Sequence, residues 1–412
     1  MTSLGIVIPL GILIFASVVL LVFWSVAAYR ILRELRALPT ARAGIAMART
    51  SPPPGSVCVV VPAHNEQGSI EALVRTLAAQ DHPRAHFVLC LDRCTDATER
   101  LARDAIGDDD RFTIIVNDHC PEDWAGKVHA VWRGVSEAAA AKDADHLLFT
   151  DADCTFAPEC LSATIALLEH RDLDMLSLFS TQETRTWFEK FVQPTTTIEL
   201  ARQYPLVRAN ERDPDNRRAF ANGQFMLFRA AAYRAIGGHE HDVIRGALLE
   251  DIAFARLLKY FRRPAGLLLA DGVVTCGMYD TWAQYRRGWK RIYTESANQK
   301  AGRLRTSAAR MVAIFVVLPV AAVLCLLLGL TIVPGEDVPL RAMSIGVPML
   351  GLIAWGFAQT VFHIAGRSPV WAVPLSPVGA WLTAGILREA ARDLDEGRAT
   401  EWGGRSYERP KR

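Results

Sequence analysis

The sequence predicts an α/β domain with a Rossmann-like, mostly parallel sheet and with transmembrane helices at both ends of the chain. Half of the 412 residues are hydrophobic, yet residues 51–300 carry the share of charge that is usual for a soluble domain. The apolar excess therefore lies at the two ends. Within residues 51–300, short β-branched runs alternate with stretches of helical periodicity, which is typical of a parallel sheet covered by helices.

The N-terminal apolar run covers residues 4–28, which contain no charged side chain. A helix needs about 20 apolar residues to cross a bilayer, so we predict a transmembrane helix within residues 1–30. The alternative is a cleaved signal peptide, but the run is too long and lacks a basic start and a small-residue cleavage site. The positive-inside rule assigns the arginines that follow to the cytoplasm: Arg30, Arg33, Arg36, Arg42 and Arg49.

Two further apolar runs, residues 311–333 and 342–365, predict a transmembrane hairpin over residues 311–366. Its connector is short and acidic, and a basic segment that includes Lys300 and Arg310 precedes it. The same rule therefore keeps the domain of residues 51–300 on the cytoplasmic side. We expect an integral protein of the cell (inner) membrane.

The C-terminal region, residues 367–412, is predicted to be a re-entrant or interfacial segment followed by a basic cytoplasmic tail. Residues 370–387 are apolar, but Pro374 and Pro377 interrupt them and they are barely long enough to cross. Three spans satisfy every basic cluster, whereas a fourth span would place the basic tail outside.

Charge and cysteine content exclude other classes. A net charge of +2 is too small to indicate a nucleic-acid partner, because such a surface needs a concentrated basic stripe. The eight cysteines form no C-x-x-C pair and no cluster at zinc spacing, so we expect reduced thiols in a cytosolic environment.

Five apolar runs are the expected strands: residues 57–61, 87–91, 112–116, 147–149 and 175–179. In sheets of this kind, ligands bind beyond the carboxyl ends of the strands. The polar residues that follow each strand are therefore the first candidates for a site. After the first strand these are Pro62, Ala63, Asn65 and Glu66, and after the second strand Asp92. Each cluster alone could equally be a loop with ordinary turn residues.

Asp151 and Asp153 follow the fourth expected strand. Two carboxylates on a segment that leaves a buried strand are costly unless a cation or strong donors compensate them. Mg²⁺ or Mn²⁺ fits, because hard ions take carboxylate and phosphate oxygen. The alternative is a cap for a following helix.

Gly126 and Lys127 lie just before an expected helix. Glycine allows a ligand to approach the backbone, and a lysine at a helix start suggests an anionic partner such as a phosphate, although a solvated lysine is the alternative. Farther on, Glu250 and Asp251 open an apolar helical stretch. They could complement the helix dipole or supply a general base.

A basic, aromatic segment at residues 284–291 includes Arg287, Trp289 and Arg291. It could be attracted to anionic lipid, or it could stabilise a departing diphosphate.

Taken together and in this order, these motifs resemble the family 2 glycosyltransferases of the GT-A fold, over residues 57–291. The resemblance implies that the residues after the first two strands line a nucleotide pocket. It also implies that Asp153 is the main ligand of a divalent metal with Asp151 beside it, and that Asp251 is the catalytic base next to Glu250. The remaining donor-binding candidates are Gly126, Lys127, Asp151, Arg287, Trp289 and Arg291.

Within that family, residues 124–127 and 402–407 are similar to the branch that glycosylates membrane lipids, including carotenoid- and hopanoid-associated enzymes. Processive polysaccharide synthases carry Gln-x-x-Arg-Trp, whereas here Gly288 separates Arg287 from Trp289. The expected activity is transfer of a sugar, from a UDP-sugar or another nucleotide sugar, to a membrane lipid with inversion. A processive synthase and a non-catalytic membrane scaffold are the alternatives.

Overall fold

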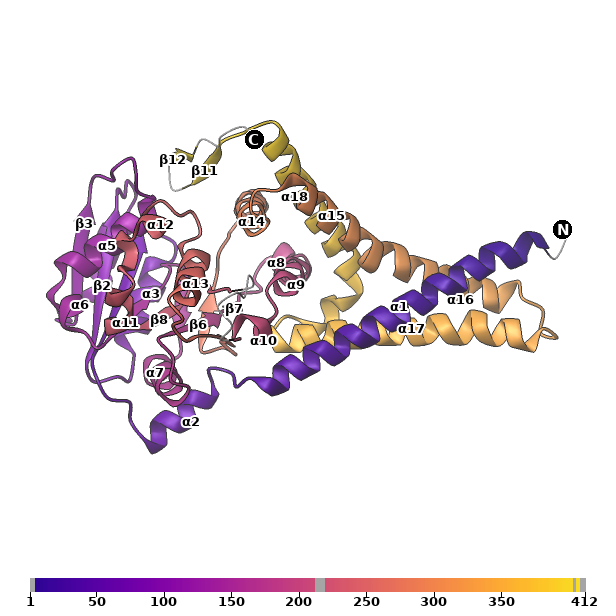
Figure 1. Ribbon diagram of the computed structural model, residues 1–412, viewed down its shortest axis with the longest axis horizontal. Coiled ribbons are helices and arrows are strands. Elements are labelled where there is room, and N and C mark those ends of the chain that lie inside the picture. The colour runs from indigo at the N-terminus through magenta and orange to yellow at the C-terminus, as the bar shows by residue number, and fades with distance from the viewer. Residues whose placement is uncertain (1–3, 212–218, 403–404, 408–412) are drawn as a thin grey trace.

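The computed structural model describes residues 4–211, 219–402 and 405–407. The molecule is elongated, with a sheet domain at one end and a long helical bundle at the other (Figure 1). Parts of the predicted tail lie outside the described residues, namely Gly403, Gly404, Arg409, Lys411 and Arg412, as do residues 1–3.

A seven-stranded sheet forms the centre of the domain, with the order β3-β2-β1-β4-β8-β6-β9. All neighbouring pairs are parallel except those of β8, which runs antiparallel to both β4 and β6. The five predicted strands are all present. The strands are β1 Val57–Ala63, β2 Ala85–Asp92, β3 Phe112–Asn117, β4 His146–Phe149, β6 Met175–Phe179, β8 Met226–Arg229 and β9 Ala265–Leu269.

Helices cover both faces of this sheet, which explains why β1 is apolar throughout rather than alternating. Val57, Val59 and Val61 join a core with α3 and α7, whereas Cys58 and Val60 join a second core with α5 and α13. The helices of the domain are α2 Ala43–Thr50, α3 Ile70–Ala78, α4 Thr98–Ile106, α5 Gly126–Glu137, α6 Ala139–Asp143, α7 Cys160–His170, α11 Ala230–Ala235, η1 Gly238–Glu240, α12 Asp242–Arg245 and α13 Glu250–Tyr260.

A second, three-stranded sheet lies beside the first, with the order β5-β10-β7. Its strands are β5 Cys154–Phe156, β7 Thr181–Gln182 and β10 Val274–Cys276. Between the domain and the bundle lie α8 Trp187–Phe191, α9 Gln193–Gln203, α10 Leu206–Ala209 and α14 Trp282–Ser296. Near the C-terminus, β11 Thr400–Trp402 pairs with β12 Arg405–Tyr407.

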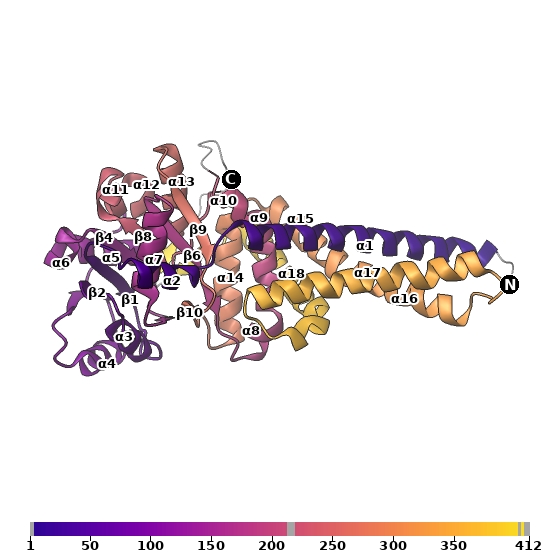
Figure 2. The same cartoon turned by 90° about the horizontal axis from the view of Figure 1, so that it is seen from below.

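The long bundle contains α1 Leu4–Ala37, α16 Leu318–Thr331 and α17 Val338–Ala365, which lie side by side in both ribbon views (Figures 1 and 2). A π-helical turn, η2 Ala313–Val317, joins α15 Ala301–Val312 to α16. Large apolar side chains on the outside of the bundle, such as Phe15, Leu327 and Ile353, are exposed. Such a surface suits lipid rather than water.

Among the described residues, four stretches of helix are long and apolar enough to cross a membrane: Ile8–Ala37, Ala301–Thr331, Val338–Ala365 and Val370–Asp395. The fourth consists of the 3-10 turn η3 Val370–Leu375 and α18 Ser376–Asp395. It leaves the bundle and packs along α14, α15 and α9 (Figure 1). This position suits the predicted interfacial segment, which stays a prediction.

Small and polar residues allow α18 to pack against the domain. A side chain on Gly379 would drive its Cβ into the carbonyl oxygen of Phe191 on α8. One turn later, the hydroxyls of Thr383 and Thr195 on α9 are hydrogen-bonded at 2.9 Å. The helix also forms ion pairs with α14, between Glu389 and Arg286 and between Asp393 and Lys290.

We predict that Gly379→Ala destabilises the protein by about 1–3 kcal/mol, because the added methyl group forces α18 away from α8. Thermal unfolding of the detergent-solubilised chain measures the effect. Gly385→Ala is the matched control on the same helix, since nothing lies within 4 Å of its Cβ position. It should not destabilise, because alanine favours helix over glycine. Equal melting temperatures for the two variants would contradict the packing of α18 on α8.

Candidate active site

The predicted loops meet at the carboxyl edge of the large sheet. Strands β2, β1 and β4 are neighbours and parallel, so the segments that follow them emerge side by side. Asp92 ends β2, Asn65 and Glu66 follow β1, and Asp151 and Asp153 follow β4. The sheet therefore brings together the candidates that the sequence places after separate strands.

Lys127, in the first turn of α5, lies at the centre of this edge. Its Nζ is 2.7 Å from Asp151 Oδ1 and 2.6 Å from Glu250 Oε1. Burial alone would lower the pKa of Lys127, but the two carboxylates raise it well above its ordinary value, so the ammonium stays charged. The anionic partners of this lysine in the structure are thus protein carboxylates. It links the loop after β4 to the start of α13.

Gly223 completes this centre from the loop before β8. A Cβ on this residue would lie 3.1 Å from Lys127 Nζ, 3.3 Å from Asp251 Oδ2 and 3.5 Å from Glu250 Oε1. Its backbone N–H donates to Asp251 Oδ2 at 2.8 Å. The absence of a side chain at Gly223 leaves room for three charged groups to approach one another.

Glu250 and Asp251 are neighbours with opposite pKa shifts. Burial would raise the pKa of Glu250, but the Lys127 ammonium more than offsets this, and the pKa is lowered. Burial, and then the charge of Glu250, raise the pKa of Asp251 to about 6. Environments that push two carboxyl pKa values apart give the two groups different chemical roles.

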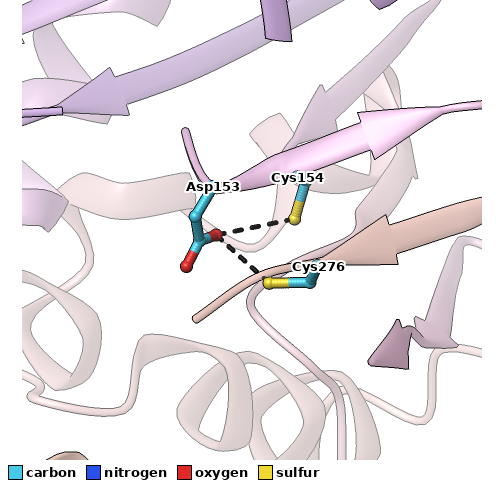
Figure 3. Close-up of side chains that lie close together, drawn as sticks. All are labelled: Asp153, Cys154 and Cys276. Atoms are coloured by element: carbon cyan, nitrogen blue, oxygen red, sulfur yellow. Dashed lines mark hydrogen bonds between the residues drawn. The ribbon is translucent and has the colours of Figure 1, made fainter. Parts of the chain in front are cut away.

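One carboxylate oxygen of Asp153 faces two thiols (Figure 3). The Sγ atoms of Cys276 and Cys154 lie 3.2 Å and 3.7 Å from its Oδ1. Burial, and then the charge of Asp151, raise the pKa of Asp153 to about 6. The residue is followed by β5 rather than by a helix, and α7 begins only at Cys160. The helix-cap interpretation of Asp151 and Asp153 is therefore wrong.

Glu66 adds a third carboxylate to this side of the site. Its pKa is raised to about 7 by burial first and by the charges of Asp153 and Asp151, while a hydrogen bond from Ser69 Oγ at 2.9 Å lowers it. Glu66 thus interacts with Asp151 and Asp153, while Asp151, Asp153, Glu250 and Asp251 all interact with Lys127. This excess of carboxylate oxygen fits a hard divalent cation, which binds through such ligands and offsets their repulsion.

Asp92 is buried and held by two partners. The Arg93 guanidinium donates to both of its oxygens, at 3.1 Å and 2.6 Å, and Asn117 Nδ2 donates to Oδ1 at 2.7 Å. Gly126 leaves room for Arg93, because a Cβ there would lie 2.7 Å from the guanidinium.

Asn65 is exposed with a φ of 58°, and its Oδ1 accepts the Thr95 N–H at 2.8 Å. Pro62 and Ala63 are buried at the end of β1.

The segment of residues 284–291 lies on α14, whose faces have different environments. Trp289 is buried between Tyr285 and Tyr293, in a core that also includes residues of α1 and α18. Its predicted contact with the donor stays a prediction. Arg291 donates to the carbonyl of Leu248 at 3.3 Å, close to the start of α13. Arg287, one turn earlier, is exposed.

Several residues of the site carry no signal in the sequence. Cys276 and Arg93 are examples, because a lone cysteine or arginine is uninformative until the fold brings a partner to it. Tyr279 is a further case. Its hydroxyl occupies the place that a Cβ on Gly288 would take, so the glycine that interrupts the Arg-Trp pair gives Tyr279 room against α14.

The sheet and the acidic groups around one lysine define an α/β enzyme domain of the GT-A type. A model of the family described as "Glycosyltransferase like family 2" matches residues 53–309, more than half of the chain. The chain belongs to this family and is a glycosyltransferase. The expected resemblance and the GT-A fold are thereby confirmed.

Solved structures similar to this chain include the mannosyltransferase PcManGT from Pyrobaculum calidifontis in complex with GDP-Man and Mn²⁺. The two are 16% identical, with 93% of this chain and 98% of that chain covered and a TM-score of 0.47. Staphylococcus aureus TarS is 15% identical, with 86% and 60% covered and a TM-score of 0.39. TarS 1–349 in complex with UDP-GlcNAc is 13% identical, with 86% and 96% covered and a TM-score of 0.38. No curated protein matched.

We predict that Lys127→Met lowers stability by about 3 kcal/mol at pH 8, because it leaves Asp151 and Glu250 without their shared cation. The pKa of Glu250 is lowered by Lys127 in the folded protein, so the stability from this pair is present above the unfolded pKa. Without the lysine the pKa of Glu250 in the folded protein should rise. The stability deficit of the variant relative to the wild type should therefore be smaller at pH 5, where Glu250 can bind a proton. Thermal unfolding at pH 8 and pH 5 measures this.

The control is Lys142→Met, which removes an exposed lysine from α6. It should change the melting temperature little at either pH. A Lys127→Met variant whose stability deficit is the same at both pH values would show that the lysine acts through packing rather than through charge.

Proposed function

We propose that this protein transfers a single sugar from a nucleotide sugar to a membrane lipid, with inversion at the anomeric carbon. The observation that carries the proposal is the convergence of Lys127, Asp151, Glu250 and Asp251 at the carboxyl edge of the sheet. Asp251 is the base within this group. It is not bonded to the lysine, and its raised pKa of about 6 lies near the pH of a cytosol, where a general base is most effective.

The donor would occupy the loops after β1, β2 and β4. Pro62, Ala63 and Asn65 would line it on one side, together with Glu66 and Asp92. We expect a UDP-sugar, whose base and ribose would lie near Asp92. Asp153 and Asp151 would hold Mg²⁺ or Mn²⁺. When bound, such an ion neutralises charge on the diphosphate.

Lys127 lowers the pKa of Glu250 and holds Asp151 and Glu250 in place, and Gly126 leaves room for the Arg93 guanidinium beside α5. Arg291 lies beside the start of α13, next to the proposed base, and Arg287 is on the same face of α14 one turn away. These two guanidinium groups would stabilise the diphosphate as it leaves. The acceptor hydroxyl would give its proton to Asp251 and attack the anomeric carbon from the opposite side.

A lipid acceptor is supported by the aromatic surface between the domain and the bundle. Trp187 on α8 is 47% exposed, and its ring packs against Trp282 on α14 at 5.1 Å between centroids. Trp371 and Trp381, on η3 and α18, are also exposed. Tryptophan is enriched where protein meets the membrane interface. Phe188, by contrast, is buried, so α8 contributes both to the core and to this surface.

The cellular location that we propose rests on the charges that flank the membrane helices. The arginines in the last turns of α1 and in the segment that follows it, together with those in α15, favour a domain on the cytoplasmic face of the cell (inner) membrane. Both the nucleotide sugar and the reduced thiols suit that compartment.

We predict that Asp251→Asn lowers turnover about 100-fold or more, because an amide cannot accept the proton of the acceptor. The amide oxygen can still accept the Gly223 N–H, so binding of a nucleoside diphosphate in the presence of Mn²⁺ should persist. Radiolabelled sugar transfer and equilibrium binding measure the two effects. Normal turnover in this variant would remove Asp251 from its role.

Glu250→Gln is the companion variant. The wild-type rate should rise with pH through about 6, because Asp251 must lose a proton and its pKa is raised to about 6. The charge of Glu250 contributes to the raised pKa of Asp251, so Glu250→Gln should move the rise in rate to lower pH. A rise in rate at the same pH in both proteins would show that the rate depends on the titration of another group.

The acceptor is tested by the size of the product. Purified protein, labelled donor and a membrane lipid extract should yield a lipid that carries one sugar, and a chelator should prevent its formation. A long polymer would support the processive alternative. Failure to transfer or hydrolyse any nucleotide sugar with Mg²⁺ or Mn²⁺ would support a non-catalytic scaffold. Lipid profiling of cells that lack the protein would then identify the acceptor.

A further inference from the structure

Strands β5 and β10 place two cysteines directly opposite each other. Cys154 pairs with Cys276 in the antiparallel register. The next pair along, Asp153 and Gly277, shares a backbone hydrogen bond, from the Gly277 N–H to the Asp153 carbonyl at 3.0 Å. The cysteine pair is therefore of the non-hydrogen-bonded kind, in which facing side chains approach most closely.

Both sulfur atoms face the same carboxylate oxygen (Figure 3). The distances to Asp153 Oδ1 are 3.2 Å from Cys276 Sγ and 3.7 Å from Cys154 Sγ, and all three ligand atoms lie within 4.8 Å of one another. Ligands of one tetrahedral zinc ion are separated by about 3.5–3.8 Å, given metal–sulfur and metal–oxygen distances of about 2.3 Å and 2.0 Å. The two oxygen–sulfur distances are thus close to this spacing, and the two sulfur atoms lie within 4.8 Å of each other.

The chemistry of these ligands differs from that of the carboxylates around Lys127. Both cysteines are 1% exposed, whereas Asp153 is only partly buried, so an ion would approach from the Asp153 side. Two sulfurs and one oxygen suit a soft or borderline ion, whereas Mg²⁺ and Mn²⁺ prefer oxygen.

The geometry points to a site for a soft divalent cation, Zn²⁺ or Cd²⁺, formed by Asp153, Cys154 and Cys276. On binding, the two thiols lose their protons to solvent and the metal gains two thiolate bonds and one carboxylate bond. Because Asp153 is shared, such an ion excludes Mg²⁺ or Mn²⁺ from it and stops sugar transfer. That last consequence rests on the proposed function, whereas the binding does not.

The test is a titration of the full-length protein in detergent with Cd²⁺, in the presence of a phosphine reductant that keeps the thiols reduced. Sulfur-to-cadmium charge-transfer absorption in the ultraviolet reports thiolate ligation. We expect a saturating absorption band in the wild type, and a loss of affinity of at least tenfold in Cys154→Ser and in Cys276→Ser. The double variant should lack the band.

Two further variants keep the result interpretable. Cys325→Ser, on α16 in the bundle, also replaces a buried cysteine and should leave the band unchanged. Asp153→Asn retains both cysteines but should weaken Cd²⁺ binding, so a folding defect of the serine variants cannot account for the whole pattern. Melting temperatures verify that each variant is folded.

The inference is overturned if the double variant retains the band, or if Cd²⁺ fails to bind to a wild-type protein that transfers sugar with Mn²⁺. In the double variant, any remaining Mn²⁺-dependent transfer should resist Cd²⁺ at concentrations that inhibit the wild type. A protein that binds Cd²⁺ through these cysteines but transfers no sugar from any donor would refute the proposed function and leave this site standing.

Discussion

The two ion pairs of Lys127 are the interactions on which the rest of the site depends. Its ammonium contacts Asp151 after β4 and Glu250 at the start of α13, two segments that are distant in sequence. Carboxylates this close together repel each other, and the shared cation makes their approach favourable. Lys127 lowers the pKa of Glu250, whereas burial and the charge of Glu250 keep the pKa of Asp251 raised to about 6 although Lys127 opposes this. One cation therefore both assembles the site and separates the roles of two adjacent acids.

Much of this arrangement follows from local pattern. A buried parallel strand must be apolar on both faces, so β1, β2 and β4 are recognisable as short β-branched or apolar runs. The chemistry of such a sheet lies where the strands end, so the amino-acid pattern alone assigns Glu66, Asp92 and Asp151 to one edge. The helix cap, the alternative for Asp151 and Asp153, fails because a strand follows them.

What could not be predicted depends on contacts between distant segments. Cys276 reaches Asp153 only because β10 pairs with β5, and no local pattern encodes that pairing. The burial of Trp289 is a second feature that the local sequence does not predict. A basic and aromatic segment indicates a surface, but the side of a helix that is buried is decided by its neighbours, and here Trp289 faces the core. The same holds for α18, for which the sequence leaves a re-entrant and an interfacial position open and whose contacts with α9, α14 and α15 depend on distant segments.

Helix α14 connects α18 to the site, and its basic residues have different partners on different faces of the helix. Arg286 and Lys290 form ion pairs with Glu389 and Asp393 on α18, so this half of the charge acts within the protein rather than on lipid. On another face, Arg291 reaches the carbonyl of Leu248, close to Glu250. Helix α14 thus contacts both α18 and the segment before α13, so the two faces of one helix connect the C-terminal helix with the residues beside the proposed base.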